Sequence, residues 1–316
     1  MSSSAHGSWR IFRGDGVARP VSMPPAPPWR RFRPGGRGSG PLPYLVAPEH
    51  ADVVNAALHL RRPLLVTGPA GTGKSSLARA VAHELSLGEL LRWPVNSRSS
   101  VQEALYQYDA IGRLRETTLS RDRGEAEPAI GTFIRLGPLG TALAPHGTPR
   151  ALLVDEMDKG DVDLPNDLLT VFEEGVFDIP ELGRLPEEMA EVEVLTADHR
   201  GSVTVRQGRV ECTEFPVVVI TSNGERDFPP AFLRRCIRLA LPMPDEERLR
   251  AIVAAHLGPE ILPEVDDLLQ AFLHRRAPGE LATDQLLNAV FLRTNGVDLD
   301  ADGLLDAVLH QLTGTV

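Results

Sequence analysis

Apolar and polar positions alternate along this 316-residue chain in a pattern that predicts strands and helices in turn. Apolar residues recur at helical spacing from Glu49, and this helix is expected to end before Pro63, because the position before a proline disfavours helical geometry. The apolar run at 63–67 predicts a strand, followed by a glycine-rich turn and a helix through Leu85. Further strands are predicted at 90–96, 151–154 and 215–220, and further helices at 100–108 and 164–174. This alternation favours an α/β sandwich built on a parallel sheet.

Other segments depart from this alternation. Residues 113–127 are charged and aperiodic, which predicts a loop within an insertion near 109–145. Valines alternate with polar residues between 181 and 214, a pattern typical of hairpins rather than of core strands, in a second insertion. Later helices are predicted near 245–257, 262–275, 281–293 and 301–312. We therefore divide the chain into an arm (1–47), an α/β domain (48–243) and a small all-α domain (244–316).

The arm is rich in Arg, Pro, Gly and Ser and has no apolar periodicity, so we expect it to be flexible and largely disordered. It holds seven arginines against the single acid Asp15, a formal charge of +6. Four aromatic residues of the arm lie among these arginines: Trp9, Phe12, Trp29 and Phe32. Two interpretations stay open: a flexible tail, or a segment that docks on a neighbouring subunit or a nucleic acid.

Composition excludes several classes of protein. The whole chain carries a net charge of −10, so the residues after the arm carry −16, and this acidic body is a poor match for a nucleic-acid backbone. No apolar run approaches the roughly 20 residues that cross a bilayer. The two cysteines, Cys212 and Cys236, make no disulfide framework, and the first residues hold no apolar block, so a cytoplasmic protein is expected.

The glycine-rich turn carries the clearest chemistry. Residues Gly68-Pro69-Ala70-Gly71-Thr72-Gly73-Lys74-Ser75 fit the phosphate-loop pattern G-x-x-x-x-G-K-[ST], between the required strand and helix. Glycines allow backbone N–H groups to surround phosphate oxygens at a helix amino terminus. Lys74 would reach the β and γ phosphates, and Ser75 would bind Mg²⁺. Lysines are rare in this chain, because 31 of its 33 Lys and Arg residues are arginines, so the lysine at this position is notable.

Two acids follow the strand at 151–154. Downstream of a phosphate loop, Asp155 is expected to hold Mg²⁺ through water, and Glu156 to polarise the attacking water. The second acid favours hydrolysis, which many phosphate-loop kinases do not carry out. The other lysine, Lys159, has no assigned role; it could bind the nucleotide of a neighbouring subunit or pair with Asp158, Asp161 or Asp163.

Two further positions are candidates for catalysis. Asn223 follows the strand at 215–220, at the sheet edge where such folds bind ligands, and could orient the water; a turn-forming role before Gly224 is the alternative. Arg234 and Arg235 end a short predicted helix. They could stabilise charge on the transferred phosphoryl group across a subunit boundary, or simply form salt bridges.

These four elements, in this order, resemble those of the AAA+ ATPases, and in particular of the MoxR-like branch. The resemblance covers residues 48–316 and is carried by GPAGTGKSSLARAVA (68–82), LLVDEMDKGDVDLPNDLLTVFEEGVFDIPE (152–181) and FPVVVITSNGERDFPPAFLRRCIRLALPMPD (215–245). It implies a P-loop αβα sandwich with a parallel sheet and a small all-α lid domain. It also implies ATP and Mg²⁺ as cofactors, and assembly into a homo-oligomer, a hexameric ring.

The resemblance assigns roles to matching positions. Lys74 and Ser75 would be the Walker A pair, Asp155 and Glu156 the Walker B pair, Asn223 sensor 1, and Arg235, in preference to Arg234, the arginine finger. The nucleotide-binding residues that it implies are Gly68, Pro69, Ala70, Gly71, Thr72, Gly73, Lys74, Ser75, Ser76 and Asp155, with Ser75 and Asp155 on the metal.

One departure from the family concerns the lid. The family usually places a sensor 2 arginine at the start of a lid helix, where this chain has Asp284. A carboxylate repels a γ-phosphate, so either Arg293 or a neighbour's arginine substitutes, or nucleotide sensing through the lid is weakened. The region Gly137-Pro138-Leu139 resembles the family's helix-2 insertion, and 190–214 resembles the hairpin before sensor 1; such loops line the pore of ring-forming relatives.

The leading prediction is a MoxR-type ATPase that hydrolyses ATP in a ring to remodel or activate a partner protein. In that branch the partner often carries a von Willebrand factor A domain. Two alternatives stay open: a nucleic-acid-linked motor or loader of the restriction or defence type, which the arginines of the arm favour and the acidic body opposes, and a nucleotide-dependent scaffold with weak turnover, which Asp284 favours. No membrane partner is expected.

Overall fold

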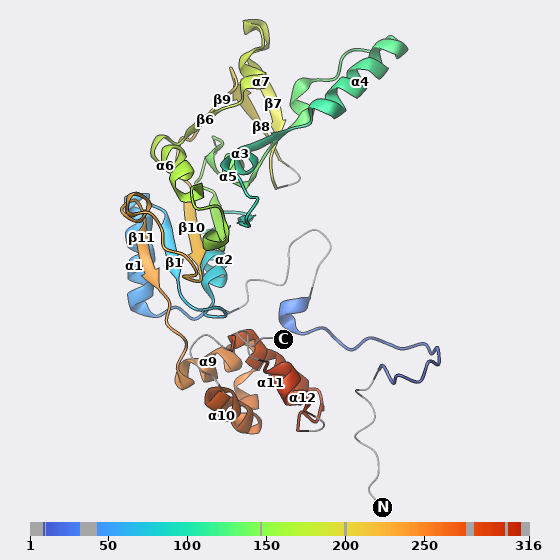
Figure 1. The fold of residues 1–316 in the computed structure, drawn as a ribbon, viewed down its shortest axis with the longest axis vertical. Coiled ribbons are helices and arrows are strands. Elements are labelled where there is room, and N and C mark those ends of the chain that lie inside the picture. The colour runs from blue at the N-terminus through green and yellow to red at the C-terminus, as the bar shows by residue number, and fades with distance from the viewer. Residues whose placement is uncertain are drawn as a thin grey trace, which may run out of the picture. The chain divides into compact units, whose positions relative to one another are not determined.

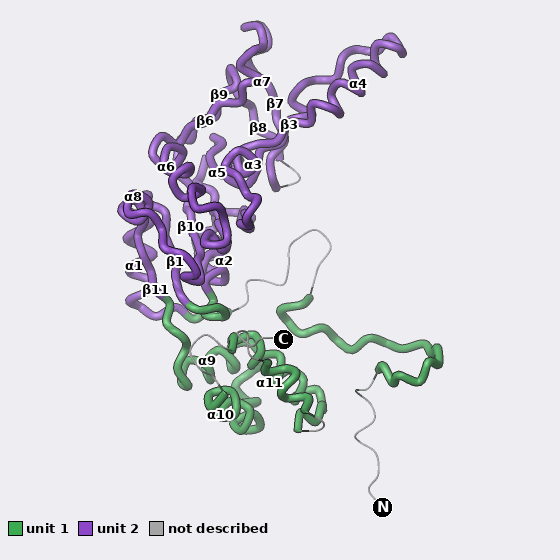
Figure 2. Tube along the Cα trace, viewed as in Figure 1, with its two compact units in different colours: residues 1–45, 69–73, 241–316 green, residues 46–68, 74–240 purple. Residues whose placement is uncertain are grey.

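The computed structural model describes residues 9, 11–31, 43–145, 147–198, 201–275, 281–300 and 303–310. Much of the arm that we expected to be disordered, residues 1–8, 10 and 32–42, lies outside this range. The chain forms two compact units (Figure 2). The larger comprises 46–68 and 74–240, and the smaller comprises 1–45, 69–73 and 241–316. Each is described by itself.

The larger unit contains a five-stranded sheet in the order β11-β1-β10-β5-β2 (Figure 1). Its strands are β1 (Leu64–Thr67), β2 (Leu91–Pro94), β5 (Ala151–Asp155), β10 (Val217–Ser222) and β11 (Ile237–Ala240). All four pairings are parallel, and every residue of β5 is buried, as expected for a sheet covered on both faces. The predicted α/β fold with a parallel sheet is confirmed, and the carboxyl ends of β1, β10 and β5 lie side by side.

A second sheet of the same unit has six strands in the order β3-β4-β7-β8-β9-β6. Its strands are β3 (Tyr106–Tyr108), β4 (Ile134–Leu136), β6 (Val176–Asp178), β7 (Glu191–Leu195), β8 (Ser202–Arg206) and β9 (Arg209–Glu211). The hairpins predicted between 181 and 214 are confirmed, because β7 pairs with β8 in antiparallel register. The prediction that these strands lie outside the core is wrong, because the alternation buries Val192, Val194 and Val205 on one face and they join the hydrophobic core of the unit.

The helices of this unit connect the strands of both sheets. They are α1 (Pro48–Leu60), α2 (Lys74–Glu84), α3 (Val101–Leu105), α4 (Ala110–Arg123), α5 (Pro138–Leu143), α6 (Leu164–Glu174), α7 (Pro180–Gly183) and α8 (Pro230–Leu233). Short 3₁₀ turns are η2 (Ile130–Phe133), η3 (Met157–Lys159) and η4 (Glu187–Met189). The helix predicted at 164–174 has the predicted bounds.

The loop predicted at 113–127 is wrong, because most of it is helix α4. Asp109 caps the helix by accepting a 2.8 Å hydrogen bond from the Gly112 amide, and Gly124 ends it with a φ of +69°. None of its residues is buried, and Figure 1 shows it extending away from the rest of the unit. A helix with no buried face leaves no apolar periodicity in the sequence, which explains the error.

Two further predictions in this region need correction. The helix expected at 100–108 ends at Leu105, because Tyr106–Tyr108 form strand β3 against β4. Pro138 and Leu139, expected in a pore-lining loop, begin helix α5, in which Leu139 is fully buried. Gly140 of this helix lies so close to the Leu105 carbonyl that an added Cβ would be 1.9 Å from it, so α5 is a packed core element.

The smaller unit is mainly helical, as predicted. Its C-terminal helices are α9 (Glu246–Leu257), α10 (Asp266–Arg275), α11 (Thr283–Thr294) and α12 (Leu304–Val308), with a 3₁₀ segment η5 (Pro259–Glu264). Parts of the helix predicted at 301–312 lie outside the described residues. Leu249, Phe272 and Leu286 are among the fully buried side chains of its own hydrophobic core. A 3₁₀ turn of the arm, η1 (Pro28–Arg30), also belongs to this unit.

Candidate functional site

The glycine-rich turn joins the end of β1 to the start of α2. Three of its residues have positive φ: Gly68 at +149°, Gly71 at +75° and Gly73 at +89°. These conformations are open to glycine and strained for other residues, which explains the glycine spacing in the sequence. The Thr72 hydroxyl donates to the Pro69 carbonyl at 3.0 Å and tightens the turn. Turns of this kind present successive backbone N–H groups to an anion.

Lys74 is the first residue of α2, and Ser75 and Ser76 follow in its first turn. The Lys74 side chain is 7% exposed, and its Nζ donates to the Gly68 carbonyl at 2.7 Å. Burial lowers the pKa of Lys74, and the nearby carboxylates of Asp158, Glu156 and Asp155 oppose this effect. The ammonium group therefore lies in a partly desolvated, acidic environment at the amino end of a helix, where an anion is favoured.

Asp155 ends β5 and gathers three hydrogen-bond donors. Its Oδ1 accepts from the Ser75 hydroxyl at 2.6 Å and from the Thr221 hydroxyl at 2.9 Å, and its Oδ2 contacts an Arg92 guanidinium nitrogen at 2.8 Å. Burial raises the pKa of Asp155, but the hydrogen bonds from Ser75, Arg92 and Thr221 outweigh it, and the pKa is lowered. The carboxylate is therefore ionised at neutral pH, with a serine hydroxyl beside it.

Glu156 follows in a left-handed conformation with a φ of +60°, one of four positive-φ residues other than glycine among those described. Its amide donates to Thr221 Oγ1 at 2.9 Å, so one threonine hydroxyl hydrogen-bonds with both Asp155 and Glu156. The Glu156 carboxylate pairs with Lys159 Nζ at 3.1 Å, and this hydrogen bond raises the pKa of Lys159. Lys159 therefore pairs with Glu156, and not with Asp158, Asp161 or Asp163, the candidate partners named from the sequence.

Asp158 connects this turn to the end of β10. Its side chain is 3% exposed, and Oδ2 accepts from the amides of Asn223 at 2.9 Å and Glu225 at 3.0 Å. Its Oδ1 is buried and has no hydrogen-bond partner among the described residues. Asn223 lies half-buried after β10, and Gly224 adopts a φ of +80°, so the residue stands at the strand edge and also in a turn.

The sequence did not indicate Thr221, Arg92 or Asp158 as parts of this cluster. Thr221 and Arg92 reach Asp155 because β10 and β2 are the two neighbours of β5 in the sheet. Strand order was not predictable from the pattern of apolar residues. The available signals were the polar Thr221 at the end of an apolar strand and an acid soon after Asp155 and Glu156.

Arg234 and Arg235 lie apart from this cluster. They precede β11, whose first residue Ile237 pairs with Leu64 at the start of β1, whereas the glycine-rich turn follows the other end of β1. The rise along β1 alone separates the two edges by about 10 Å. Arg235 Nε contacts Glu173 Oε1 at 2.5 Å, which raises the pKa of Arg235, and Arg234 is exposed. The structure therefore brings Lys74 and the acids together at the carboxyl ends of the strands, and places Arg234 and Arg235 near the amino ends.

In the smaller unit, the start of α11 lies against the glycine-rich turn. A Cβ added to Gly71 would be 2.5 Å from the Ala282 Cβ, and one added to Gly73 would be 3.0 Å from the Tyr44 ring. Asp284 is exposed in the first turn of α11. Arg293 is nine residues further along, about 14 Å by helical rise, and pairs with Asp267 at 3.1 Å. Arg293 is therefore engaged within the lid helices, away from the turn.

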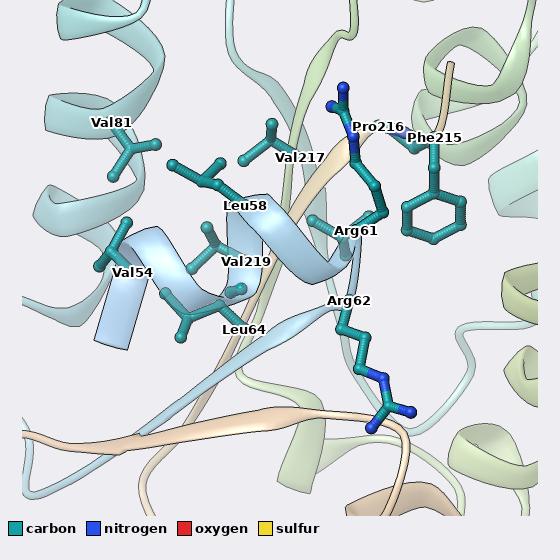
Figure 3. Close-up of a pocket in the computed structure, with 12 residues that line it drawn as sticks. Val54, Leu58, Arg61, Arg62, Leu64, Val81, Phe215, Pro216, Val217 and Val219 are labelled. Atoms are coloured by element: carbon teal, nitrogen blue, oxygen red, sulfur yellow. The ribbon is translucent and has the colours of Figure 1, made fainter. Parts of the chain in front are cut away.

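An apolar pocket of the larger unit lies elsewhere, between α1 and the amino ends of β1 and β10 (Figure 3). Val54, Leu58 and Val217 line it, and the Arg61 and Arg62 guanidinium groups extend away from these side chains. Arg61 pairs with Glu214 at 3.1 Å, and Arg62 donates to the Arg234 carbonyl at 3.1 Å. The pocket is thus at the edge opposite the glycine-rich turn and does not belong to the acidic cluster.

Among the described residues, none of the helices combines the length and the apolar character needed to span a membrane.

One family model covers the part of the chain that holds this site. Residues 63–236, more than half of the chain, match the family model described as AAA domain (dynein-related subfamily). No protein of curated function matches the sequence. Among solved structures, NtrX from Brucella abortus in complex with ADP is 16% identical, with a TM-score of 0.42 over 84% of this chain and 54% of that one. The same protein in complex with ATP is 15% identical, with a TM-score of 0.44 over 86% and 57%. The chain thus spans little more than half of those chains.

Proposed function

The chain belongs to the AAA domain family, dynein-related subfamily, and from this premise we propose that it is an ATPase that binds ATP with Mg²⁺ and hydrolyses it to ADP and phosphate. The AAA+ resemblance of the sequence is confirmed at the level of this family. The observation that carries the proposal is the cluster around Asp155, which joins Ser75, Thr221 and the acids beside Lys74 at one sheet edge.

The donors of this cluster suit a magnesium ion. Ser75 Oγ and Asp155 Oδ1 are hard oxygen ligands that lie 2.6 Å apart, and the buried Asp158 Oδ1 lacks a hydrogen-bond partner among the described residues. Ser75 and Asp155 would hold Mg²⁺, Asp155 through water. When bound, the ion supplies positive charge to the β and γ phosphate oxygens.

The other residues divide the work of hydrolysis. Lys74 would bind the phosphates with its buried ammonium group. Glu156 would accept a proton from the attacking water at its carboxylate, which the Thr221 hydrogen bond to its backbone holds in place. Asn223, fixed by Asp158 through its own amide, would orient that water.

We also propose that the ATPase works as a MoxR-type ring that remodels or activates a partner protein. The expected partner carries a von Willebrand factor A domain. The position of Arg234 and Arg235 is compatible with this proposal, because they lie near the amino ends of the strands, away from this chain's own glycine-rich turn, so a nucleotide that they contacted would belong to a neighbouring subunit. Glu173 would release Arg235 when a neighbour docks.

A nucleotide-dependent scaffold with weak turnover is the second candidate. It is favoured by the acid at Asp284, at the end of α11 nearest the glycine-rich turn, and by the ion pairs that engage Arg293 elsewhere. Without a lid arginine, less charge stabilisation is available to the transition state.

The experiment compares the wild-type chain with Glu156→Gln in steady-state phosphate release and in binding of a fluorescent ATP analogue with Mg²⁺. We expect Glu156→Gln to lose roughly 10²–10⁴-fold in turnover and to keep binding. Glu225→Gln is the matched control, since the Glu225 backbone amide donates to Asp158 and its carboxylate acts on Lys159 only through its charge. Wild-type turnover in Glu156→Gln would refute the proposed base, whereas turnover equal to the blank in both, with binding intact, would establish the scaffold. Proteins that copurify with ATP-bound Glu156→Gln would identify the partner.

A further inference from the structure

The smaller unit contains a contact that the proposed hydrolysis does not use. Trp29 of the arm lies half-buried against α9 and α11. Its indole ring meets the Phe291 ring at 5.9 Å between centroids and 71° between planes, and the His256 ring at 6.5 Å and 67°. Its Nε1–H donates to Asn288 Oδ1 at 3.1 Å. Both the apolar ring and the polar N–H are therefore satisfied, as expected for an anchoring tryptophan.

The residues that receive Trp29 form a composite surface, here called the Trp29 site. Asn288 and Phe291 are three positions apart and share one face of α11, and His256 comes from the last turn of α9. The His256 ring is itself held by a 2.9 Å hydrogen bond between Nδ1 and the Ile252 carbonyl. Trp9 also packs on the hydrophobic cluster of this unit. Two tryptophans of the arm thus pack against the same hydrophobic cluster.

The charges and the chain stiffness of the arm favour this docking. The arm carries +6, whereas residues 241–316 hold 13 acids and five arginines, a formal charge of −8. Opposite charges raise the encounter rate of the two segments. The run Pro24-Pro25-Ala26-Pro27-Pro28 restricts the backbone immediately before Trp29, so less conformational entropy is lost when Trp29 docks.

We propose that the Trp29 site is a docking site for the arm of the same chain, with Trp29 as its anchor. The site is therefore an intramolecular interaction surface on the lid helices, and the basic, proline-rich arm is its ligand. Helix α11 carries the site at Asn288 and Phe291 and meets the glycine-rich turn at Ala282. A docked arm consequently restrains the helix that contacts the turn.

The experiment is limited trypsin digestion of the full-length chain, with cleavage after Arg30 and Arg31 followed by mass spectrometry. Cleavage requires the docked segment to open, so its rate reports the undocked population. We expect Trp29→Ala to raise this rate about tenfold, and Asn288→Ala, which removes only the acceptor, about threefold. Asn288→Ala leaves the sequence around the cleaved bonds unchanged. Phe12→Ala is the matched control, because Phe12 is an aromatic residue of the same arm that is 88% exposed.

Two further measurements decide the remaining outcomes. Cleavage after Arg250, which lies within α9, reports the folding of the helices that receive Trp29, and should match the wild type in both variants. If Trp29→Ala raises cleavage after Arg250, the rate of cleavage after Arg30 and Arg31 in Asn288→Ala decides. Equal cleavage after Arg30 and Arg31 in wild type, Trp29→Ala and Asn288→Ala overturns the proposal. Protection that grows with protein concentration also overturns it, because the arm then docks on another copy. Protection that is independent of concentration, and lost in both variants, supports it.

Discussion

Thr221 offers the sharpest test of the acidic cluster. Its hydroxyl is a single group with two partners: it donates to Asp155 Oδ1 at 2.9 Å and accepts from the Glu156 amide at 2.9 Å. The residue is 1% exposed, so no solvent replaces these partners. Thr221→Val keeps the side-chain shape and removes both hydrogen bonds, whereas Thr221→Ser keeps the hydroxyl.

The expected cost follows from these two hydrogen bonds. A hydrogen bond to a charged carboxylate contributes about 1.5–3 kcal/mol, and a buried amide left without a partner costs about 1–3 kcal/mol. The greater apolar surface that valine buries offsets part of this loss, so we expect Thr221→Val to destabilise the larger unit by about 3 kcal/mol. At roughly 2–4 °C per kcal/mol for a unit of this size, Tm should fall by about 6–12 °C.

Thermal unfolding of both variants, paired with steady-state phosphate release, measures the effect. The Glu156 backbone loses its anchor in Thr221→Val, so we expect kcat to fall at least about tenfold with a smaller change in KM. Thr221→Ser should recover most of the stability and turnover. A Thr221→Val protein with wild-type Tm and wild-type kcat would refute the role assigned to this hydroxyl.

The remaining predictions concern the lysines and pH. Lys74→Arg should reduce ATP turnover at least about 100-fold despite the conserved charge, because a planar guanidinium does not fit the position of the ammonium group of this buried residue, which is 7% exposed. Fluorescent-nucleotide binding and phosphate release check this prediction. Lys159→Ala should change the unfolding free energy by less than about 1 kcal/mol in urea titrations, since both partners of its ion pair are more than 40% exposed; a larger loss would contradict this. The pKa of Asp155 is lowered on folding, so its hydrogen bonds stabilise the fold above the ordinary pKa of 3.8 and are lost as pH falls through the lowered value. The difference in stability between wild type and Thr221→Val should therefore be constant above about pH 5 and shrink in acid, as denaturation at several pH values can show.

Much of the molecule was predictable because its signals are local. The phosphate loop is one contiguous pattern, and its glycines occupy positive-φ positions at Gly68, Gly71 and Gly73. The apolar pattern along the chain was enough to predict strongly apolar strands such as β5 and β10 and an amphipathic helix such as α6. A short-range pattern suffices wherever burial acts on one face of an element.

The local pattern of apolar residues could not predict helix α4 or the contacts of Asp155 with distant residues. Without a buried face, α4 has no apolar stripe, and only its caps at Asp109 and Gly124 mark it. Two of the three partners of Asp155, Thr221 and Arg92, are 66 and 63 residues away along the chain. They meet only because β10 and β2 flank β5, and strand order depends on how whole layers pack.

The sequence by itself determined the α/β class, the phosphate loop and the identity of the chemical groups, because each depends on neighbouring residues. Tertiary structure decided which groups share one site. It placed Thr221 between Asp155 and Glu156, paired Lys159 with Glu156, left the arginines at the opposite edge of the sheet, and seated Trp29 on the lid helices. Hydrogen bonds and ion pairs act over a few ångströms in space. Most of these contacts join residues that are far apart along the chain and close only after folding, so the local sequence does not predict them.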